Sequence, residues 1–391
     1  MKIQFCGAAQ TVTGSKHLLT TAKGKKILFD CGLFQGKGSE TDGLNRHFGF
    51  NPAEIDYVIL SHAHIDHAGL LPRLVNEGFN GTILCTPATY SLCQIMLIDS
   101  GNIQEQEVQY INKKRRKEGK HLLKPLYTAA DAMVCLQYFE TVPYNHEYHF
   151  DKHHSFFFTD AGHILGSAAV HFTWREEDEF KRLTFTGDIG RYNDAILRAP
   201  EPFPQADYII CESTYGNREH ASFYNAEERL LEVIAETCVM NRGKIIIPAF
   251  SVDRTQEVLL ALNHFHNAGK LPAIPVFVDS PLSTKATQVM REHKECYNDQ
   301  MLELLRTDDD PFGFHGITFV PSVEESIKLN FLKGPAIIIS ASGMAEAGRV
   351  KHHIKNNIGD ERNTILIVGY CTPGSLGGRL RNGAEEVSIF G

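Results

Sequence analysis

The sequence predicts an α/β protein with two domains of different architecture. Its length of 391 residues exceeds what one hydrophobic core usually holds. Up to residue 212 the pattern is mainly short β-rich runs separated by glycine, whereas from Asn225 onward helical and strand patterns alternate strictly. The first pattern predicts stacked sheets with flanking helices, and the second predicts a parallel sheet covered by helices.

The first part combines predicted strands with one long helix. Short apolar or alternating runs bounded by glycine and polar residues are typical of strands, and the polar stretch over residues 90–117 is long enough for a helix. The first five residues also alternate like a strand and do not resemble a secretory signal. The remaining strands are predicted at residues 17–21, 26–29, 56–60, 82–85, 156–159, 168–174, 183–186 and 208–211.

The second part reads as helices and strands in turn. Such alternation is the pattern of repeated crossover units, in which each helix connects two parallel strands. Helices are predicted at residues 226–239, 255–266, 284–293, 323–332 and 349–356. The intervening strands are predicted at residues 244–248, 275–278, 317–320, 336–340 and 364–368.

Composition limits the functions that the chain can have. With 42% hydrophobic and 22% charged residues, and apolar runs no longer than a strand, the sequence predicts a cytoplasmic protein without a membrane span. The nine cysteines contain no Cys-x-x-Cys pair and are interpreted as buried free thiols. A net charge of −8 argues against binding of nucleic acid by the whole surface, so a polyanion would be held locally by metal ions and a few basic side chains.

Residues 61–67 are the most informative stretch, because they place three imidazoles and one carboxylate directly after an apolar run. Side chains alternate near the end of a strand, so His62 and His64 can point the same way and bind one cation. Asp66 and His67 follow where the chain turns into a helix, and they can reach a second cation beside the first. A histidine-rich polar turn is the alternative, and it is less compatible with four ligand-type side chains at this spacing.

Two further residues have the position of metal ligands. His163 follows a predicted strand and lies between small glycines, and Asp188 ends another strand, where its carboxylate could bridge two ions. Either residue alone would be interpreted as part of an ordinary turn. Together with the histidine cluster they favour metal binding.

These motifs resemble those of the metallo-β-lactamase fold. The resemblance rests on His62-x-His64-x-Asp66-His67, Gly162-His163, Gly187-Asp188 and the upstream segment 28–32. It implies that His62, His64 and His163 hold one zinc ion, that Asp66 and His67 hold a second, and that Asp188 bridges the two. Asp30 would orient these ligands through hydrogen bonds without binding metal. A histidine at position 64, where di-iron relatives carry a carboxylate, favours hydrolysis over redox chemistry.

The second part of the chain resembles the β-CASP insertion of nucleic-acid-processing members of that superfamily. The segments that carry the likeness are residues 209–216, 247–257, 278–282, 340–349 and 368–380. The implied fold is a metallo-β-lactamase αββα sandwich with an inserted β-CASP domain. The implied domains are residues 1–212, the insertion at 213–363, and an incomplete return segment at 364–391.

The resemblance implies a zinc-dependent phosphodiester hydrolase that acts on RNA, or on single-stranded DNA, in a cleft between two domains. Metal-activated water would be the nucleophile. Asp66 would receive or steer the proton of this water, and Glu212 would orient a general acid near the leaving group. Alternatives are a non-catalytic RNA-binding scaffold and a small-molecule hydrolase of thioesters or lactones, although such hydrolases generally lack the inserted domain.

Glycine-rich turns and arginines in the second part are candidate phosphate contacts. Turns that precede helices expose backbone amides, which suit phosphate, although an ordinary steric role for the glycines remains open. The candidate substrate-binding residues are Ser342, Gly343, Met344, Gly377, Arg254, Arg349 and Arg379. The basic run 113–117 is either a solvated helix end or a surface that attracts RNA, and the histidines at 146–154 are interpreted as a hairpin surface.

The chain departs from the pattern at its end. Complete β-CASP nucleases carry two further histidines after the segment matched by residues 369–391, one a ligand of the second zinc and one the partner of Glu212. We therefore expect an under-filled second zinc site, full activity for a longer gene product, and weak or no activity for residues 1–391. Missing final strands would leave a sheet edge open to pairing, which makes a homodimer an expectation.

Overall fold

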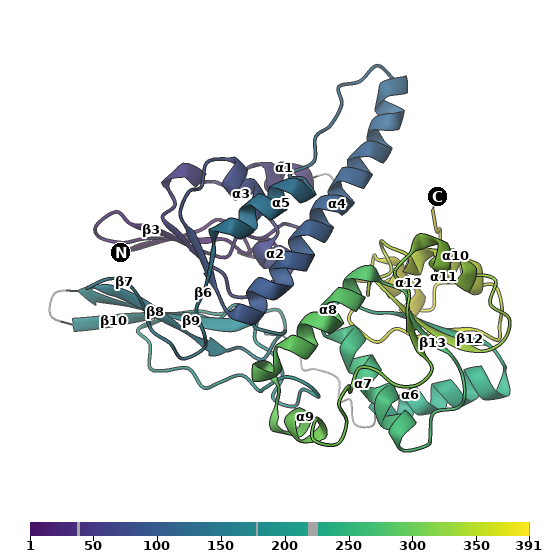
Figure 1. The fold of residues 1–391 in the computed structure, drawn as a ribbon. Helices are drawn as coiled ribbons and strands as arrows, with labels where there is room; N and C mark the ends of the chain where they lie inside the picture. Colours follow the sequence, from purple (N-terminus) through teal and green to yellow (C-terminus); the bar gives the residue numbers. More distant parts are fainter. Residues whose placement is uncertain (37–39, 177–178, 218–225, 391) are drawn as a thin grey trace. The chain divides into compact units, whose positions relative to one another are not determined.

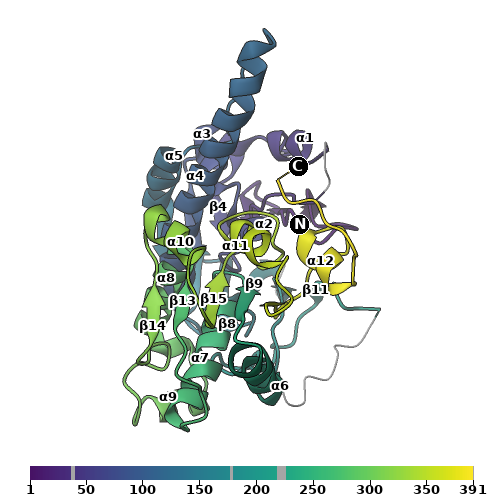
Figure 2. The ribbon, with the colours of Figure 1, turned by 90° about the vertical axis from the view of Figure 1, so that its right-hand side faces the viewer.

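The protein is described by a computed structural model that covers residues 1–36, 40–176, 179–217 and 226–390. The chain divides into two compact units, Met1–Arg218 and Glu219–Gly391. Figure 1 and Figure 2 show the ribbon from two directions. Each unit has its own hydrophobic core, so each can be described by itself.

The first unit contains a six-stranded mixed sheet in sequential order. Its early strands pair antiparallel and its later strands pair parallel, and each parallel pair is joined by a crossover. The strands are β1 (Lys2–Phe5), β2 (His17–Thr20), β3 (Lys26–Phe29), β4 (Tyr57–Ile59), β5 (Thr82–Cys85) and β6 (Phe139–Thr141). The helices are α1 (Glu40–Arg46), η1 (Pro52–Glu54), α2 (Ile65–Ala68), α3 (Leu71–Asn76), α4 (Pro87–Lys117), α5 (Ala129–Cys135) and η2 (Leu136–Tyr138).

A second, five-stranded sheet completes this unit. It is antiparallel except for the parallel pair β10–β11, and its strands are β7 (Tyr148–Asp151), β8 (His154–Asp160), β9 (Ala168–Glu176), β10 (Glu179–Phe185) and β11 (Tyr208–Ile210). Phe29 from the first sheet packs in one core with Phe172 and Phe185 from the second. The two sheets are therefore the layers of the predicted sandwich.

All strands predicted for this unit are present, because each contains an apolar run, although β8 begins two residues and β10 four residues earlier than predicted. The long helix begins at Pro87 instead of residue 90, since the Thr86 side chain accepts a hydrogen bond from the Thr89 amide at 3.2 Å and Pro87 occupies the first turn. The short elements α1, α5, β6 and β7 were not predicted. Segments of this length carry too few residues for a periodic pattern to stand out.

The second unit is a parallel sheet with helices between its strands. Its strand order is β14 (Ile317–Phe319), β13 (Val276–Val278), β15 (Ala336–Ser340), β12 (Lys244–Pro248) and β16 (Thr364–Ile365). The helices are α6 (Ala226–Ile234), which continues as the π-helix η3 (Ala235–Met240), then α7 (Arg254–Asn267), α8 (Pro281–Glu292), η4 (Lys294–Cys296), α9 (Asp299–Leu304), α10 (Val323–Leu329), α11 (Val350–Asn357) and α12 (Leu376–Arg381). The predicted parallel α/β architecture is confirmed.

The order of the strands creates a switch point between β12 and β15. From β12 the chain crosses to β13 on one side, whereas from β15 it crosses to β16 on the other side. In open parallel sheets, ligands bind where neighbouring connections diverge in this way, at the carboxyl ends of the strands. The loops that begin at Ala249 and Ala341 lie at that point.

Residues 364–390 pack within the second unit. β16 pairs with β12, and Leu376 and Ile389 contact the core that contains Ile246. The structure here differs from the expectation that residues 364–391 begin a return to the first domain. The strand is also shorter than predicted, because its ladder with β12 ends at Ile365, although the Leu366 amide still donates to Ile246 O at 2.9 Å.

Two predictions from composition can be compared with the structure. No helix among the described residues is both long and apolar enough to span a bilayer. All nine cysteines are free, and most of them are buried, as expected for packed thiols; Cys211 is the exposed one.

Candidate metal centre and substrate loops

Four ligand atoms from three separate loops of the first unit converge on one point. His62 and His64 lie between β4 and α2, His163 follows β8, and Asp188 follows β10. The His64 Nδ1 atom lies 3.1 Å from His62 Nε2 and 3.2 Å from His163 Nε2, and Asp188 Oδ2 lies 3.4 Å from His163 Nε2. These ligand atoms all lie within 4.8 Å of one another.

The donor set and its spacing fit a small divalent cation. Ligand nitrogens about 2.0 Å from a tetrahedral zinc ion lie about 3.3 Å apart, close to the separations seen here. Burial lowers the pKa of His64 to about 3 and holds the pKa of His62 well below its ordinary value. Both imidazoles are therefore neutral near pH 7, which is the form that binds metal.

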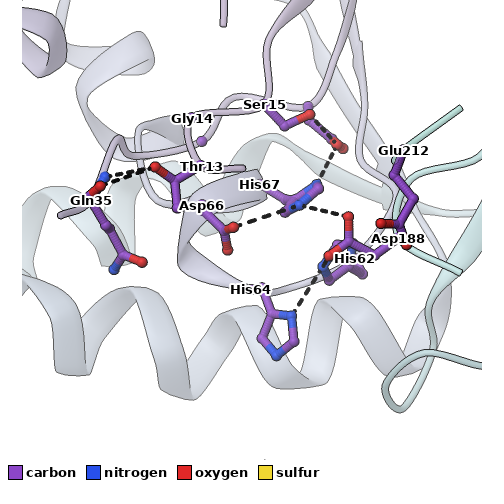
Figure 3. A network of polar contacts seen from close by, with 12 residues as sticks. Thr13, Gly14, Ser15, Gln35, His62, His64, Asp66, His67, Asp188 and Glu212 are labelled. Atoms are coloured by element: carbon purple, nitrogen blue, oxygen red, sulfur yellow. Dashed lines mark hydrogen bonds and ion pairs between the residues drawn. The ribbon is translucent and has the colours of Figure 1, made fainter. Parts of the chain in front are cut away.

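A second, looser group lies beside the first. His67 Nε2 is 3.3 Å from Asp188 Oδ1 and 3.9 Å from Asp66 Oδ2, and Figure 3 shows these side chains around His67. Asp188 therefore turns one carboxylate oxygen toward each group. This is the arrangement of a carboxylate that bridges two cations. Only three side chains of the described residues contribute to the second group.

The protonation states of Asp188 and His67 depend on their short separation in the second group. Burial by itself would raise the pKa of Asp188, but the neighbouring His67 outweighs burial and holds this pKa well below its ordinary value. Burial by itself would lower the pKa of His67, but the carboxylates of Asp188 and Asp30 raise it well above its ordinary value. A cation between Asp66 and Asp188 would therefore displace the Nε2 proton of His67.

Asp30 lies buried behind the ligand side chains and accepts hydrogen bonds from His67 and Ser61. Its side chain is fully buried and accepts hydrogen bonds from His67 Nδ1 at 2.7 Å, from the Ser61 amide at 2.8 Å, and from the hydroxyls of Ser15 and Ser61 at 3.0 Å each. A histidine that donates one ring N–H to a carboxylate presents its other nitrogen in a fixed direction. The structure thus places Asp30 where it can orient His67, as the resemblance implies.

Ser61 links Asp30 to His62. Its hydroxyl has one proton, and the Asp30 carboxylate can only accept, so this proton goes to Asp30. Ser61 Oγ, 3.0 Å from His62 Nδ1, then accepts the Nδ1 proton and leaves Nε2 as the ligand atom. Sequence reasoning named neither Ser61 nor Ser15 as a site residue. Adjacency to the cluster could have pointed to Ser61, whereas no pattern pointed to Ser15.

Glu212 lies next to Asp188, as Figure 3 shows. Its carboxylate accepts from the Ile189 amide at 2.9 Å and from the Thr214 amide at 3.3 Å. Glu212 therefore holds the backbone that follows Asp188. Its negative charge also acts on His163, in the direction that raises the pKa of this imidazole, although burial outweighs it.

Two glycines allow the ligand loops to approach one another. A Cβ atom on Gly190 would lie 1.5 Å from Gly162 O, and one on Gly32 would lie 1.6 Å from Asp66 O. No side chain fits at either place, so the Asp188 loop can lie against the His163 loop, and the end of β3 against α2. The close approach of backbone requires glycine here.

The candidate substrate loops meet in the second unit. The Gly377 amide donates to Met344 O at 3.0 Å, and a Cβ atom on Gly343 would lie 2.6 Å from the Phe250 ring. Ser342 closes its own turn, because its Oγ accepts from the Ala347 amide at 3.3 Å. These loops include the carboxyl ends of β12 and β15, at the switch point where ligands of parallel sheets bind.

The three candidate arginines differ in their surroundings. Arg254 pairs with Glu257, and Arg379 has a buried Nε atom without a hydrogen-bond partner among the described residues. Arg349 donates to Asp279 at 2.6 Å and to the carbonyls of Val320 and Pro321 at 3.1 Å each. Arg349 is therefore engaged in holding its own unit together, and a phosphate contact by it stays a prediction.

The start of α12 does not offer a free amide to phosphate. The Leu376 amide donates to the Glu346 side chain, and the Gly378 amide donates to Ser375 Oγ at 3.1 Å. The expected exposed donors of the second glycine-rich turn are thus already paired within the unit.

We expect the second unit to lose stability at low pH, because protonation of Asp279 removes a stabilising charge. Burial by itself would raise the pKa of Asp279, but hydrogen bonds from His353, Ser326 and Arg349 outweigh burial and lower this pKa below 3.8. A depressed carboxyl pKa stabilises the fold above about pH 4 and loses this effect as pH falls through the folded-state pKa. Asp279→Asn should lower the free energy of unfolding at pH 7 by about 3 kcal/mol.

Urea unfolding between pH 3 and pH 7 measures this effect. The difference between wild type and Asp279→Asn should narrow toward pH 3, whereas Asp299→Asn, an exposed change at the start of α9, should match wild type throughout. A difference that stays constant with pH would contradict the role of the ionised carboxylate.

The histidines at 146–154 lie around the β7–β8 hairpin. His154 Nδ1 lies 2.9 Å from Asp151 Oδ1, and His149 Nε2 lies 3.7 Å from Glu147 Oε2. Among the described residues, a tight convergence of four ligand atoms occurs at the group that contains His62. His146 and His149 are exposed as expected for a hairpin surface, whereas His154 is buried and pairs with Asp151.

A sandwich of two sheets with converging histidine and aspartate side chains at its loops, in a chain similar to ribonucleases, indicates a metal-dependent hydrolase. The metallo-beta-lactamase superfamily model matches residues 17–214, and the Beta-Casp domain model matches residues 255–380. The chain thus belongs to the β-CASP RNA-processing family of the metallo-β-lactamase superfamily.

Curated relatives align along nearly the whole chain. It is 33% identical to Ribonuclease TTHA0252 of Thermus thermophilus, with 100% of this chain and 84% of the relative covered. It is 31% identical to an RNase J-like protein of Methanocaldococcus jannaschii, with 99% and 82% covered. It is 33% identical to transcription termination factor FttA of Methanosarcina mazei, with 100% of this chain and 59% of the relative covered.

Proposed function

We propose that this protein hydrolyses phosphodiester bonds of RNA with the help of two zinc ions. The observation that carries the proposal is the position of Asp188, whose two oxygens face two different ligand groups. His62, His64 and His163 would hold one ion together with Asp188 Oδ2. Asp66 and His67 would hold the other together with Asp188 Oδ1.

The ions would supply the electrostatic part of the chemistry. Bound zinc lowers the pKa of water to about 7 and stabilises negative charge on phosphate oxygens, and two ions can serve both the attacking and the leaving oxygen. The ligand set contains three neutral imidazoles on the first ion, which leaves a net positive site for a phosphodiester anion.

Three carboxylates would have separate tasks. Asp66 is mostly enclosed beside His67, and as a further ligand it would receive or steer the proton that the nucleophilic water loses. Glu212 would orient the Asp188 backbone and, as the resemblance implies, a general acid near the leaving group. Asp30 would keep His67 in place without contact with metal.

The loops of the second unit would hold the RNA backbone. Ser342, Gly343, Met344 and Gly377 lie together with Arg254 nearby, at the end of the sheet where ligands bind. Two curated relatives are a ribonuclease and an RNase J-like protein, which supports RNA as the substrate. The net charge of −8 agrees with substrate binding by such local groups rather than by the whole surface.

Metal removal and reloading tests the proposal. The protein is stripped with chelator, reloaded with Zn²⁺, Mn²⁺ or Mg²⁺, and incubated with RNA and DNA strands of one sequence labelled at either end. We expect RNA cleavage that follows zinc loading, one tightly bound zinc ion and a second that binds more weakly because only three side chains hold it, and loss of cleavage in His64→Ala. The control His149→Ala changes an exposed histidine of the same unit and should leave zinc content and cleavage unchanged.

Two other outcomes would replace the proposal. RNA binding that does not depend on metal, with no cleavage under any loading, would indicate a scaffold protein. Turnover of a thioester or lactone without RNA cleavage would indicate a small-molecule hydrolase. The end label that appears in the first products distinguishes trimming from either end and cleavage inside the strand.

A further inference from the structure

Helix α4 forms an arm that leaves the body of the first unit. It begins at Pro87, where Thr86 and Thr89 donate to Gly166 O at 2.6 and 2.8 Å, so its start lies beside the loop of His163. Its 31 residues span about 45 Å. Figure 1 and Figure 2 both show its second half extending away from the sheets of its unit.

The arm is held in a defined shape by the segment that returns from it. Asn112 pairs with the backbone of Leu123 in both directions, at 2.9 and 3.0 Å, and Arg115 Nε donates to His121 O at 2.7 Å. Nearer the body, Gln104 accepts from the Leu126 amide at 3.1 Å. These bonds fix one face of the helix against the returning chain and leave the other face to solvent.

The solvent face of the arm carries lysines around an exposed tyrosine. Lys113, Lys114 and Lys117 follow Tyr110 by three, four and seven residues, and this spacing places all four on one side of a helix. Tyr110 is 78% exposed, and the Lys114 side chain is 84% exposed. Arg116, Lys120 and Lys124 add positive charge nearby, and Glu118 is the one acidic residue between 112 and 124.

Charge selects the kind of partner that this face fits. The whole chain has a net charge of −8, so the dense positive charge at the end of α4 contrasts with the rest of the protein. This end would attract anionic partners. Positive side chains around an exposed aromatic ring are the features with which proteins hold single-stranded nucleic acid, because lysines contact phosphates and the ring stacks on a base.

We propose that the tip of α4, with Tyr110, Lys113, Lys114 and Lys117, is a second RNA-binding site remote from the metal centre. The proposal rests on the proposed function, since it assigns the arm to the same substrate. The tip lies about 40 Å along the helix from its start beside the His163 loop. A strand that advances about 3.4 Å per nucleotide needs about 12 nucleotides to reach from one to the other. Long RNA would therefore contact both places, and short RNA would contact one.

Binding measured without turnover tests this proposal. Fluorescent oligouridylates of 8 and 40 nucleotides are titrated with the full chain in EDTA at several salt concentrations. For the long strand, Lys113→Ala/Lys114→Ala/Lys117→Ala should weaken binding about tenfold and reduce the slope of log K against log salt by about 2. Tyr110→Ala should weaken binding of the long strand about tenfold with little change in slope. Binding of the short strand should weaken much less in both variants.

A matched triple variant controls for the loss of charge. Lys2→Ala/Lys23→Ala/Lys152→Ala removes three exposed lysines of the same unit and should bind both strands like wild type, apart from a small uniform effect. Thermal unfolding should be unchanged in all variants, because none of the replaced side chains is buried. Equal loss in the control and the arm variant, or equal loss for both strand lengths, would overturn the proposal.

Other results separate this proposal from the proposed function. Wild type that cleaves 8-nucleotide RNA but binds the long strand no more tightly would refute the arm and leave the ribonuclease standing. Wild type that cleaves no RNA, yet loses long-strand binding in the arm variant, would refute the ribonuclease and leave the arm. A change in oligomeric state with Tyr110→Ala, measured by sedimentation and without an RNA effect, would show that the arm binds a second copy of the chain, and would overturn its assignment to RNA.

Discussion

Asp188→Asn should lower RNA cleavage at least a thousandfold and remove at least one zinc ion per chain. The wild-type carboxylate turns Oδ2 toward His62 and His163 and Oδ1 toward His67. An amide of the same shape has one oxygen and one NH2 group, which only donates, so it can face only one of the two groups as a ligand. A thousandfold loss corresponds to about 4 kcal/mol of transition-state stabilisation. Zinc content by elemental analysis and cleavage of labelled RNA measure the two effects separately.

Asp207→Asn provides the control for Asp188→Asn. Asp207 lies in the same unit and accepts from the Arg182 amide at 2.8 Å, but it is on the surface beside Lys181 and away from the ligand loops. We expect wild-type zinc content and cleavage from this variant. Cleavage by Asp188→Asn within about threefold of wild type, with both zinc ions retained, would contradict a bridging carboxylate.

Asp30→Ala should have the largest effect on stability. Asp30 is fully buried and accepts four hydrogen bonds, so its removal leaves His67 Nδ1, the Ser61 amide and two hydroxyls without their acceptor. Loss of one partner from such a buried, charged network costs about 3–5 kcal/mol of unfolding free energy. Because His67 and His62 also lose their orientation, zinc affinity should fall about 10- to 100-fold. Urea unfolding of the metal-free protein and competition with a zinc chelator measure these quantities.

Ser15→Ala is the graded control for Asp30→Ala. It removes one of the hydroxyl donors at 3.0 Å and leaves the other three bonds to Asp30 in place. The expected loss is about 1 kcal/mol of stability, with a small change in zinc affinity. Equal effects from Ser15→Ala and Asp30→Ala would mean that the carboxylate itself does not organise the ligands.

The predictions from sequence were most successful where a local pattern is complete in itself. The apolar runs at 26–29, 82–85, 244–248 and 336–340 coincide with β3, β5, β12 and β15, because a buried strand needs only a few consecutive apolar residues. Short elements such as α5 and β6 were missed, since the contacts that hold them are to distant residues. The end of the chain shows the same limit: residues 364–390 pack on β12 and its core, which the family resemblance did not imply.

The same distinction holds for the candidate metal centre. The spacing of His62, His64, Asp66 and His67 marks a ligand cluster because four such side chains in six residues have no common structural reason. The resemblance adds His163 and Asp188 as further ligands. Neither the spacing nor the resemblance indicates that His64 turns its Nδ1 atom toward His163, or that Ser61 and Ser15 hydrogen-bond to Asp30. These contacts join residues that are separated in sequence, and only the fold brings them together.

The sequence left open the roles of the candidate arginines and of the basic run 113–117. The fold shows that their surroundings differ. Arg349 is a candidate phosphate contact by sequence, and the structure shows that its guanidinium also binds Asp279 and two carbonyls. The basic run 113–117 could be a solvated helix end or a surface that attracts RNA, and the structure places its lysines on an arm that extends from the unit, on a face shared with Tyr110. A sequence shows which charges exist, whereas only packing shows which of them are already paired.

The amino-acid sequence by itself determined the two kinds of architecture and the ligand types at the strand ends, because hydrophobic periodicity and residue chemistry are local properties. Tertiary structure decided which oxygens and nitrogens meet. It places the two Asp188 oxygens toward different groups and closes the hydrogen bonds beneath His67, and it brings the ligand loops together at glycines where backbone meets backbone. Those distances arise from the packing of sheets whose strands lie more than a hundred residues apart, and no local pattern encodes them.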